Sequence, residues 1–387
     1  MGRDQKIRVC HVMSGDLWAG AEVQAFTLLM KLHETPELEV RAIVLNEGKL
    51  ASSLRDNGLD VDVIDESKHG FRSILRHARE LLQNQKTDII HSHRRKENVL
   101  AGLLKRSGHT KYLVQTVHGA PEPFKGLNRI REKFYMGLNN YFTTRHFDHI
   151  LPVSDDLKQY LGERLGRGRL TTVHNSINVD EVLPDRGSVE VKRAFGFSEG
   201  HTVIGSAGRM VAVKGFDIFL KAGRILLEKR PDVRFLLVGD GPQLEDLQKL
   251  AKELGIDGQV RFPGFRNDMT DLLNCLDVFV VSSHHEGIPT VVLEAMALKK
   301  AVVATSVGGM IEMLDADVSG ILVPPSNAGA IASACERLLN DSALRERLGR
   351  AAREKVERHF SARTQAEKVV DIYRQLAGCS GEDKRRA

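Results

Sequence analysis

Short apolar runs alternate with longer segments of helical hydrophobic period along nearly the whole chain. This alternation is typical of β-α-β units, in which parallel strands form a sheet covered by helices. The first half predicts strands at Ile7–Met13, Glu39–Leu45, Val61–Ile64, Ile89–His91, Tyr112–Val117 and His149–Val153, with a short one at Leu170–His174. The second half predicts strands at Thr202–Ala207, Arg234–Val238, Val260–Phe262, Val278–Val281, Ala301–Ala304 and Gly320–Val323.

Two doubly wound α/β domains explain this pattern. It restarts near the stretch from Pro184 to Ser188, and a length of 387 residues favours two domains over one. We therefore expect an N-terminal domain over residues 1–182 and a C-terminal domain over residues 183–360. The final helical segment, Ser361–Ala377, carries an apolar stripe that it must bury against another element.

Composition narrows the class of protein. Hydrophobic residues make up 42% and charged residues 28%, which is ordinary for a folded globular protein. No apolar run approaches the roughly 18 residues of a membrane span, and the chain leads directly into its first strand, so we expect no signal peptide. The 4 cysteines form no C-x-x-C pair, which disfavours zinc or disulfide frameworks. These features together predict a cytoplasmic protein.

Charge and aromatic content bear on the partners. The net charge of +5 favours anionic partners such as phosphates, while 5% aromatic residues and no recognition motif argue against nucleic acid. A basic and apolar segment, Phe124–Tyr135, is a candidate for weak contact with a membrane surface. An ordinary amphipathic helix or an acceptor-side loop explains the same segment.

Loops at the carboxyl ends of parallel strands are where such folds bind ligands. The loop Gly15–Glu22 has small residues at 19 to 21 that would let an anion approach a helix start, although any strand-to-helix turn uses glycine. His118 follows the strand Tyr112–Val117 directly. It is placed to donate a hydrogen bond to a sugar hydroxyl or to developing charge, with a purely structural histidine as the alternative.

Two further loops carry charged side chains in the second half. Arg209 and Lys214 stand among glycines after the strand Thr202–Ala207. Such a pair of cations suits a departing diphosphate, whereas two solvated surface residues are the alternative.

After Val278–Val281, Pro289 marks a helix start whose N–H groups at 287, 288 and 290 would favour an anion. Glu286 and Glu294 bracket that turn. They can bind hydroxyl groups of a sugar and of a ribose, unless they are two solvated acids.

The segment E-G-I-P-T-V-V-L-E-A-M-A, residues 286 to 297, resembles the signature of the family 4 retaining glycosyltransferases. The motifs that agree with it, in the family's order, are Gly208-Arg209 with Lys214-Gly215, Val238–Pro242, Phe262–Phe265 and Gly308-Gly309 before Glu312. The resemblance extends from Ile7 to about Leu376. It implies the α/β fold called GT-B: two Rossmann-like doubly wound domains facing across a cleft, with residues 361–380 crossing back to the first domain.

The resemblance also implies roles for individual residues. The catalytic set would be His118 and Glu286 at the donor sugar with Arg209 and Lys214 at the diphosphate. The remaining contacts would come from Gly20 on the acceptor side, Phe265 and Arg266 beside the base, Gly287, Ile288, Pro289 and Thr290 at the helix start, and Glu294 at the ribose. The first loop has Ala19-Gly20 where the family usually has two glycines, which affects the acceptor contacts.

The implied activity is transfer of a hexose, with retention of configuration, from a nucleotide diphosphate donor that we expect to be a UDP-sugar. The acceptor would be a saccharide or a lipid-linked saccharide in cell-surface polysaccharide or lipopolysaccharide biosynthesis, with the enzyme cytoplasmic or peripheral on the inner face of the membrane. A non-catalytic sugar-nucleotide or glycan-binding protein on the same fold is the alternative. An NAD-dependent oxidoreductase is disfavoured because no G-x-G-x-x-G opens either half.

Two motifs resemble metal sites. Asp60-Val61-Asp62 matches a metal-binding D-x-D, but its neighbours predict a strand with both acids facing solvent. His91-Ser92-His93 has no third ligand at a suitable spacing in the sequence. We therefore predict no metal site and no cofactor apart from the nucleotide-sugar co-substrate.

Overall fold

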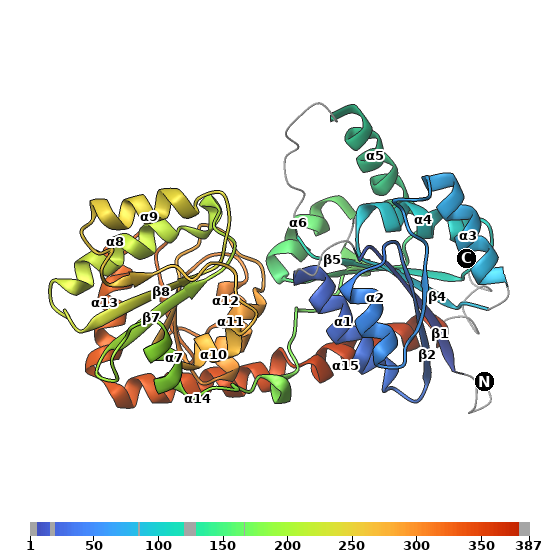
Figure 1. The fold of residues 1–387 in the computed structure, drawn as a ribbon. Helices are drawn as coiled ribbons and strands as arrows, with labels where there is room; N and C mark the ends of the chain where they lie inside the picture. The colour runs from blue at the N-terminus through green and yellow to red at the C-terminus, as the bar shows by residue number, and fades with distance from the viewer. Residues whose placement is uncertain (1–5, 16–19, 84–85, 120–128, 166, 379–387) are drawn as a thin grey trace. The chain divides into compact units, whose positions relative to one another are not determined.

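A computed structural model of the chain describes residues 6–15, 20–83, 86–119, 129–165 and 167–378. The chain forms two compact units, residues 1–176 with 362–387 and residues 177–361. Each unit contains one sheet of six parallel strands covered by helices (Figure 1). Within the described residues, no helix combines the length and the apolar character that a membrane span requires.

The sheet of the first unit has the strand order β3-β2-β1-β4-β5-β6. Its strands are β1 (Ile7–Met13), β2 (Leu38–Val44), β3 (Asp60–Val63), β4 (Ile89–Ser92), β5 (Tyr112–Val117) and β6 (His149–Pro152). The central strand β1 pairs with β2 and β4, so that His11 lies opposite His91. Strands buried on both faces form near-continuous apolar runs, which is why these segments are visible in the sequence.

Helices cover both faces of this sheet. They are α1 (Gly20–His33), α2 (Lys49–Asp56), α3 (Phe71–Gln83), α4 (Arg95–Arg106), α5 (Arg129–Arg145), α6 (Asp155–Leu165) and α15 (Ala362–Gly378), with a 3₁₀ turn at Arg167–Arg169. One core packs α1, α2 and α15 on the sheet, and the other packs α3 and α4 on its opposite face. The apolar stripe of the C-terminal helix α15 is thereby buried on the first unit, against α1 and β1.

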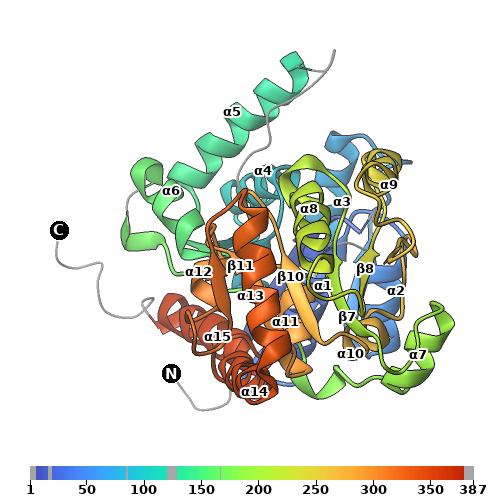
Figure 2. The same cartoon turned by 90° about the vertical axis from the view of Figure 1, so that its left-hand side faces the viewer.

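The second unit repeats the same topology. Its strands are β7 (Thr202–Ala207), β8 (Val233–Val238), β9 (Val260–Arg261), β10 (Val278–Val281), β11 (Ala301–Thr305) and β12 (Ile321–Val323), in the order β12-β11-β10-β7-β8-β9. Its helices are α7 (Ser188–Ala194), α8 (Phe216–Leu227), α9 (Leu244–Glu253), α10 (Met269–Asn274), α11 (Thr290–Ala297), α12 (Met310–Met313), α13 (Ala328–Asn340) and α14 (Ser342–His359), with 3₁₀ turns at Val179–Glu181 and Ala212–Lys214. In Figure 2, α13 lies in front of β10 and β11, which it contacts.

The predicted strand Leu170–His174 is wrong, because the structure has only a single bridge between Leu170 and Ile150 there. The segment runs beside β6 with backbone bonds from Thr171 and Val173, and then leaves the sheet. Gln24 of α1 binds both backbone groups of Ser176, which turns the chain away before a ladder forms. The other predicted strands are observed with ends within one residue of those expected.

The strand order reverses at one place in each sheet, between β1 and β4 in the first unit and between β7 and β10 in the second. At such a switch point, the loops beyond the carboxyl ends of the strands diverge to either side and leave room for a ligand. The loops after β1, β4 and β5, and those after β7 and β10, are therefore the candidate ligand-binding loops.

Candidate active site

Lys214 and Glu286 meet at the switch point of the second unit. Lys214 Nζ lies 2.6 Å from Glu286 Oε1, and the Ser283 hydroxyl donates to the same oxygen over 2.6 Å. Glu286 is only 7% exposed, whereas Lys214 is half-buried. Two residues predicted from separate loops thus form a pair in which a buried carboxylate has a cation beside it.

Glycine is required where these loops press together. Gly215 has a φ of +61°, and a Cβ there would lie 2.2 Å from the carbonyl oxygen of Ser282. Gly308 has a φ of +45°, and a Cβ there would lie 2.1 Å from the carbonyl oxygen of Glu286. Only glycine fits such an approach without backbone movement, so these glycines set the position of Lys214 and Glu286.

Arg209 lies at the carboxyl end of β7, on a loop that is held in place by the residue that follows it. The next residue, Met210, is fully buried, and its N–H donates to the carbonyl of Asp240 over 2.8 Å. The Arg209 side chain is exposed and makes no hydrogen bond or ion pair with any residue that the structure describes. Its guanidinium is therefore available to an anionic ligand.

The helix α11 begins beside Glu286. Pro289 is its N-cap residue, one position earlier than the first-turn place predicted for it, and the Ile288 side chain is buried beneath the turn. The N–H groups of Gly287 and Thr290 make no hydrogen bond to another described residue. Backbone donors at the start of this helix thus face the surface where a phosphate could accept from them.

Glu294 lies in the second turn of α11 and is half-buried. Burial raises the pKa of its carboxyl above the ordinary value, and no described residue donates a hydrogen bond to it. A half-buried carboxylate without hydrogen-bond donors is stabilised when a ligand brings hydroxyl groups. These groups donate hydrogen bonds to the carboxylate oxygens in place of the water that burial excludes.

Phe265 and Arg266 follow β9 at the same end of the sheet. Phe265 is 74% exposed, which is unusual for a large apolar side chain. The Arg266 guanidinium binds Asp268 over 2.8 and 2.7 Å, and Gly239 anchors this loop by donating to the carbonyl of Gly264. The loop is held in place and presents an aromatic face.

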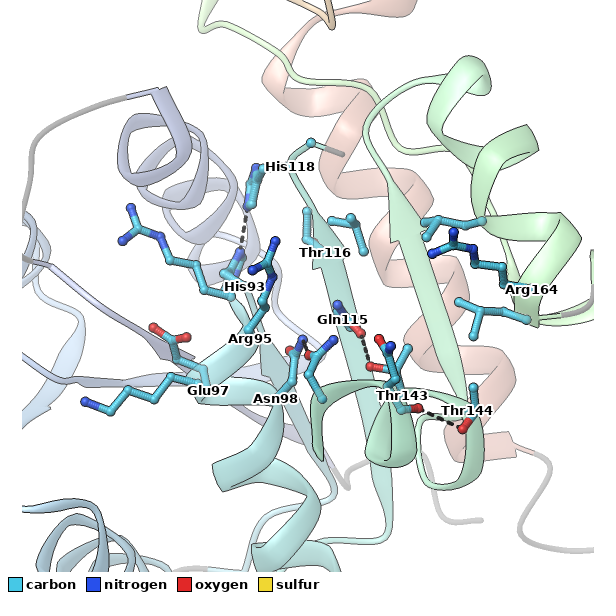
Figure 3. Close-up of a pocket in the computed structure, with 18 of the residues that line it drawn as sticks. His93, Arg95, Glu97, Asn98, Gln115, Thr116, His118, Thr143, Thr144 and Arg164 are labelled. Atoms are coloured by element: carbon cyan, nitrogen blue, oxygen red, sulfur yellow. Dashed lines mark hydrogen bonds between the residues drawn. The ribbon is translucent and has the colours of Figure 1, made fainter. Parts of the chain in front are cut away.

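A pocket of about 570 Å³ opens at the switch point of the first unit (Figure 3). The residues around it come from the loops after β1, β4 and β5 and from α4, α5 and α6, and include Ser14, His93, Glu97, Gln115, His118 and Arg164. The cavity is lined by amide groups, hydroxyl groups, and positively and negatively charged side chains. These groups can donate hydrogen bonds to a polyhydroxylated ligand and accept them from it.

Glu97 is the buried acid of this pocket. One carboxylate oxygen accepts from the Ser14 hydroxyl, and Oε2 is enclosed with no partner among the described residues. Burial raises its pKa above the ordinary value. Asn98 beside it donates to Asn139 over 2.7 Å. Neither residue was predicted; a carboxylate one turn into the helix after a buried strand is the signal that could have identified Glu97.

His118 follows β5 directly and lines the pocket. Its Nε2 lies 3.3 Å from Nδ1 of His93, while its own Nδ1 is enclosed with no partner among the described residues. Burial, with a smaller contribution from Arg94, lowers the pKa of His118 to about 4. The ring is therefore neutral at pH 7.

Some predicted features lie partly outside the residues that the structure describes. Gly20 is the first residue of α1 and is exposed, but residues 16–19 of its loop lie outside the described residues. Residues 124–128 of the basic and apolar segment do so as well, and the segment continues into α5.

The prediction that His91 and His93 have no third companion is wrong. His11, on the neighbouring strand β1, brings its ring nitrogens within 4.8 Å of theirs. Parallel pairing of β1 with β4 causes this contact, which the spacing of the histidines along the sequence does not predict. The D-x-D motif lies on β3, where both acids form ion pairs with Arg41 instead of facing only solvent, although Asp60 is exposed.

Two family models match the chain over consecutive ranges. The model of glycosyltransferase family 4 matches residues 18–181, and the model of the glycosyl transferases group 1 matches residues 189–355. The chain belongs to these glycosyltransferases. Membership in a family of enzymes favours catalysis over a binding module without activity. The two matched ranges contain Glu97 and His118 of the first unit and Arg209, Lys214, Glu286 and Glu294 of the second, whereas Ser14 precedes the first range.

Relatives of this glycosyltransferase include a galactosyltransferase and a lipopolysaccharide core glycosyltransferase. It is 23% identical over 386 residues to the UDP-Gal:alpha-D-GlcNAc-diphosphoundecaprenol alpha-1,3-galactosyltransferase of Escherichia coli, covering 95% of this chain and 97% of that one. It is 36% identical over 174 residues to the lipopolysaccharide core biosynthesis glycosyltransferase LpsE of Rhizobium meliloti strain 1021, covering 45% of this chain and 49% of LpsE. The latter match thus spans about half of either protein.

The fold agrees with solved glycosyltransferase structures. Anabaena Alr3699/HepE in complex with UDP superposes with a TM-score of 0.81 at 18% identity, over 95% of this chain and 100% of that one. The two parallel six-stranded sheets are those of the GT-B fold, as the sequence predicted.

Proposed function

We propose that this glycosyltransferase transfers a hexose from a UDP-sugar to a saccharide or lipid-linked acceptor, with retention of configuration and without a metal ion. The observation that carries the proposal is the Lys214–Glu286 pair at the switch point of the second unit. This pair supports the proposal because a cation that suits phosphate lies beside a carboxylate that suits sugar hydroxyls, and Arg209 adds a second cation after β7.

The second unit is the proposed donor site. Arg209 and Lys214 neutralise the diphosphate as its negative charge grows, in place of a divalent ion. Glu286 binds hydroxyls of the sugar while the N–H groups around Pro289 bind phosphate oxygens. Glu294 accepts from the ribose hydroxyls, and the loop with Phe265 and Arg266 lies beside the base.

The pocket of the first unit is the proposed acceptor site. Its amide, hydroxyl and carboxylate groups suit a saccharide, and its arginines suit a phosphate-linked one. Two relatives support an acceptor of this class: the Escherichia coli galactosyltransferase, named for a diphosphoundecaprenol-linked sugar, and LpsE, named for lipopolysaccharide core biosynthesis. Lipopolysaccharide or another surface polysaccharide is therefore the proposed product.

Retention needs no nucleophile from the protein in the route that we propose. The acceptor oxygen bonds to the anomeric carbon on the face from which the diphosphate departs. The acceptor proton passes to a phosphate oxygen of that leaving group. The protein supplies charge and position, with His118 donating a hydrogen bond to the transferred sugar.

A thermal-shift screen across UDP, GDP and ADP and their sugars tests the donor. UDP at a hundred times its Kd is expected to stabilise the native protein by about 2.7 kcal/mol, which corresponds to a rise in Tm of roughly 5 to 10 °C for a domain of this size. The shift should persist in EDTA, since Arg209 and Lys214 provide the charge. A UDP shift that EDTA abolishes, or a shift with GDP or ADP alone, would contradict the donor or the absence of metal.

Glu294→Ala is expected to weaken UDP binding by about tenfold, because a hydrogen bond from ribose hydroxyls to a charged group is lost. Titration calorimetry with UDP measures the change. The matched control is Glu245→Ala, which removes an exposed glutamate from α9 of the same unit and should bind UDP like the parent protein. Equal loss in both variants would argue against a specific role for Glu294.

A further inference from the structure

A continuous line of hydrogen bonds begins on β5 of the first unit and passes behind the pocket. Thr116 Oγ1 lies 2.7 Å from His91 Nε2. The other ring nitrogen of His91 lies 2.6 Å from the hydroxyl of Tyr373, on the C-terminal helix α15. That hydroxyl lies 3.2 Å from Nε2 of His11. Residues up to 362 positions apart in the sequence are joined in this way.

The line continues to the residue that borders the pocket. His11 Nδ1 lies 3.1 Å from His93 Nε2, and His93 Nδ1 lies 3.3 Å from His118 Nε2. Figure 3 shows this last contact. The rings of His91 and His93 are stacked with centroids 4.8 Å apart and an angle of 7° between their planes. His11, His91 and Tyr373 are fully buried, so water does not compete for the hydrogen bonds among these three residues.

The rings in this line are neutral at physiological pH. Burial lowers the pKa of His11 to about 3 and that of His118 to about 4, and it lowers the pKa values of His91 and His93 as well. A neutral imidazole has one N–H donor and one acceptor nitrogen. Each ring therefore donates on one side and accepts on the other, and the direction of one bond fixes the direction of the next.

Thr116 sets that direction. The direction that we infer has the Thr116 hydroxyl as donor, with His91 Nε2 as its acceptor among the described residues. His91 must then donate from Nδ1 to the Tyr373 oxygen, and the Tyr373 hydroxyl must donate to His11.

The same alternation completes the line to the pocket. His11 donates from Nδ1 to His93, which donates from Nδ1 to Nε2 of His118. Because Nε2 of His118 accepts, the proton of His118 resides on Nδ1.

We propose that this line of hydrogen bonds, from Thr116 to His118, fixes the tautomer of His118 so that Nδ1 presents a neutral N–H donor to an oxygen atom of the transferred sugar. The Nδ1 atom is the enclosed nitrogen that has no partner among the described residues. His11, His91, His93 and Tyr373 are positioning residues, since they act through His118. The sugar as ligand rests on the proposed function, whereas the tautomer is a property of the protein alone.

Long-range ¹H–¹⁵N correlation spectra of protein labelled with ¹⁵N-histidine test the tautomer directly. The parent protein without ligand is expected to show His118 with its proton on Nδ1, assigned by its loss in His118→Gln. Tyr373→Phe removes the donor to His11, and Thr116→Val removes the first donor of the line. Both variants should shift His118 toward a mixture that includes the Nε2–H form.

Conservative variants separate this role from a loss of structure. Thr116→Ser keeps the hydroxyl and should restore the parental tautomer. Tyr112→Phe removes a tyrosine hydroxyl from β5 outside the line, and should leave the His118 signals unchanged. The NMR spectrum of each variant also reports whether it is folded, so Thr116→Val decides the matter if Tyr373→Phe does not fold.

Kinetics supply the second readout. Tyr373→Phe is expected to lower kcat for transfer about tenfold, the effect of one misdirected hydrogen bond, while KM for the donor changes less than twofold. If the parent protein transfers no sugar at all, the proposed function fails while the spectra still decide the tautomer.

Three results would overturn the inference. The first is a parental His118 with its proton on Nε2. The second is a His118 spectrum that neither Tyr373→Phe nor Thr116→Val alters. The third is a stoichiometric metal ion, removed by chelator and held by His11, His91 and His93, because a metal would replace the hydrogen bonds between these rings.

Discussion

Lys214→Ala is expected to lower kcat/KM for sugar transfer by a hundredfold or more. A preorganised donor at a developing charge contributes roughly 3 kcal/mol to the transition state, and Lys214 lies at the strand end where we place the departing diphosphate. Arg209→Ala should show a loss of the same order. The double variant should lose less than the product of the two, because both cations act on one leaving group. Initial rates with the donor identified by thermal shift measure all three.

The control for these variants is Lys221→Ala. Lys221 belongs to the same unit and forms an ion pair with Asp217 on the exposed side of α8, so its removal deletes a lysine without touching the site. It should retain the parental rate. Near-parental rates for Lys214→Ala and Arg209→Ala would refute the role assigned to them, and an equal loss in Lys221→Ala would indicate a general effect of charge.

The first unit is expected to lose stability steeply as the pH falls below about 6.5, where the histidines of an unfolded chain take up protons. His11, His91 and His93 are buried and their pKa values are lowered by burial, so the native state stays unprotonated. The unfolded state then binds more protons than the native state, and its free energy falls relative to the native state. Between pH 7 and pH 5.5, these three groups together should lower the free energy of unfolding by about 4 kcal/mol.

Hydrogen exchange, corrected for the intrinsic effect of pH, measures this loss. The second unit serves as an internal control, since His284 and His285 are exposed and His201 is only half-buried. Amides of β1 should lose protection between pH 7 and pH 5.5 more steeply than amides of β10. Parallel loss in both strands would mean that the histidines of the first unit do not resist protonation. Above pH 7 neither unit should respond through these groups.

The sequence determined the fold and the candidate residues of the proposed donor site. Strands buried on both faces are apolar runs, so the elements of both sheets were visible as a pattern, except where Gln24 draws the chain at Ser176 away from the sheet. The candidates for the proposed donor site were visible because close loop packing requires glycine, and because Glu286 and Glu294 share a short segment with a helix start. Features that depend on residues close together in the sequence can be predicted from the sequence alone.

Only the tertiary structure decided the rest. The strand order of the first sheet makes β1 and β4 neighbours, which brings His11 beside His91 across 80 residues of sequence. The return of α15 adds Tyr373 to that group, and burial leaves one oxygen of Glu97 without a partner among the described residues. Such contacts depend on which strands pair and on which atoms are buried away from water. Neither property can be predicted from the spacing of residues along the chain.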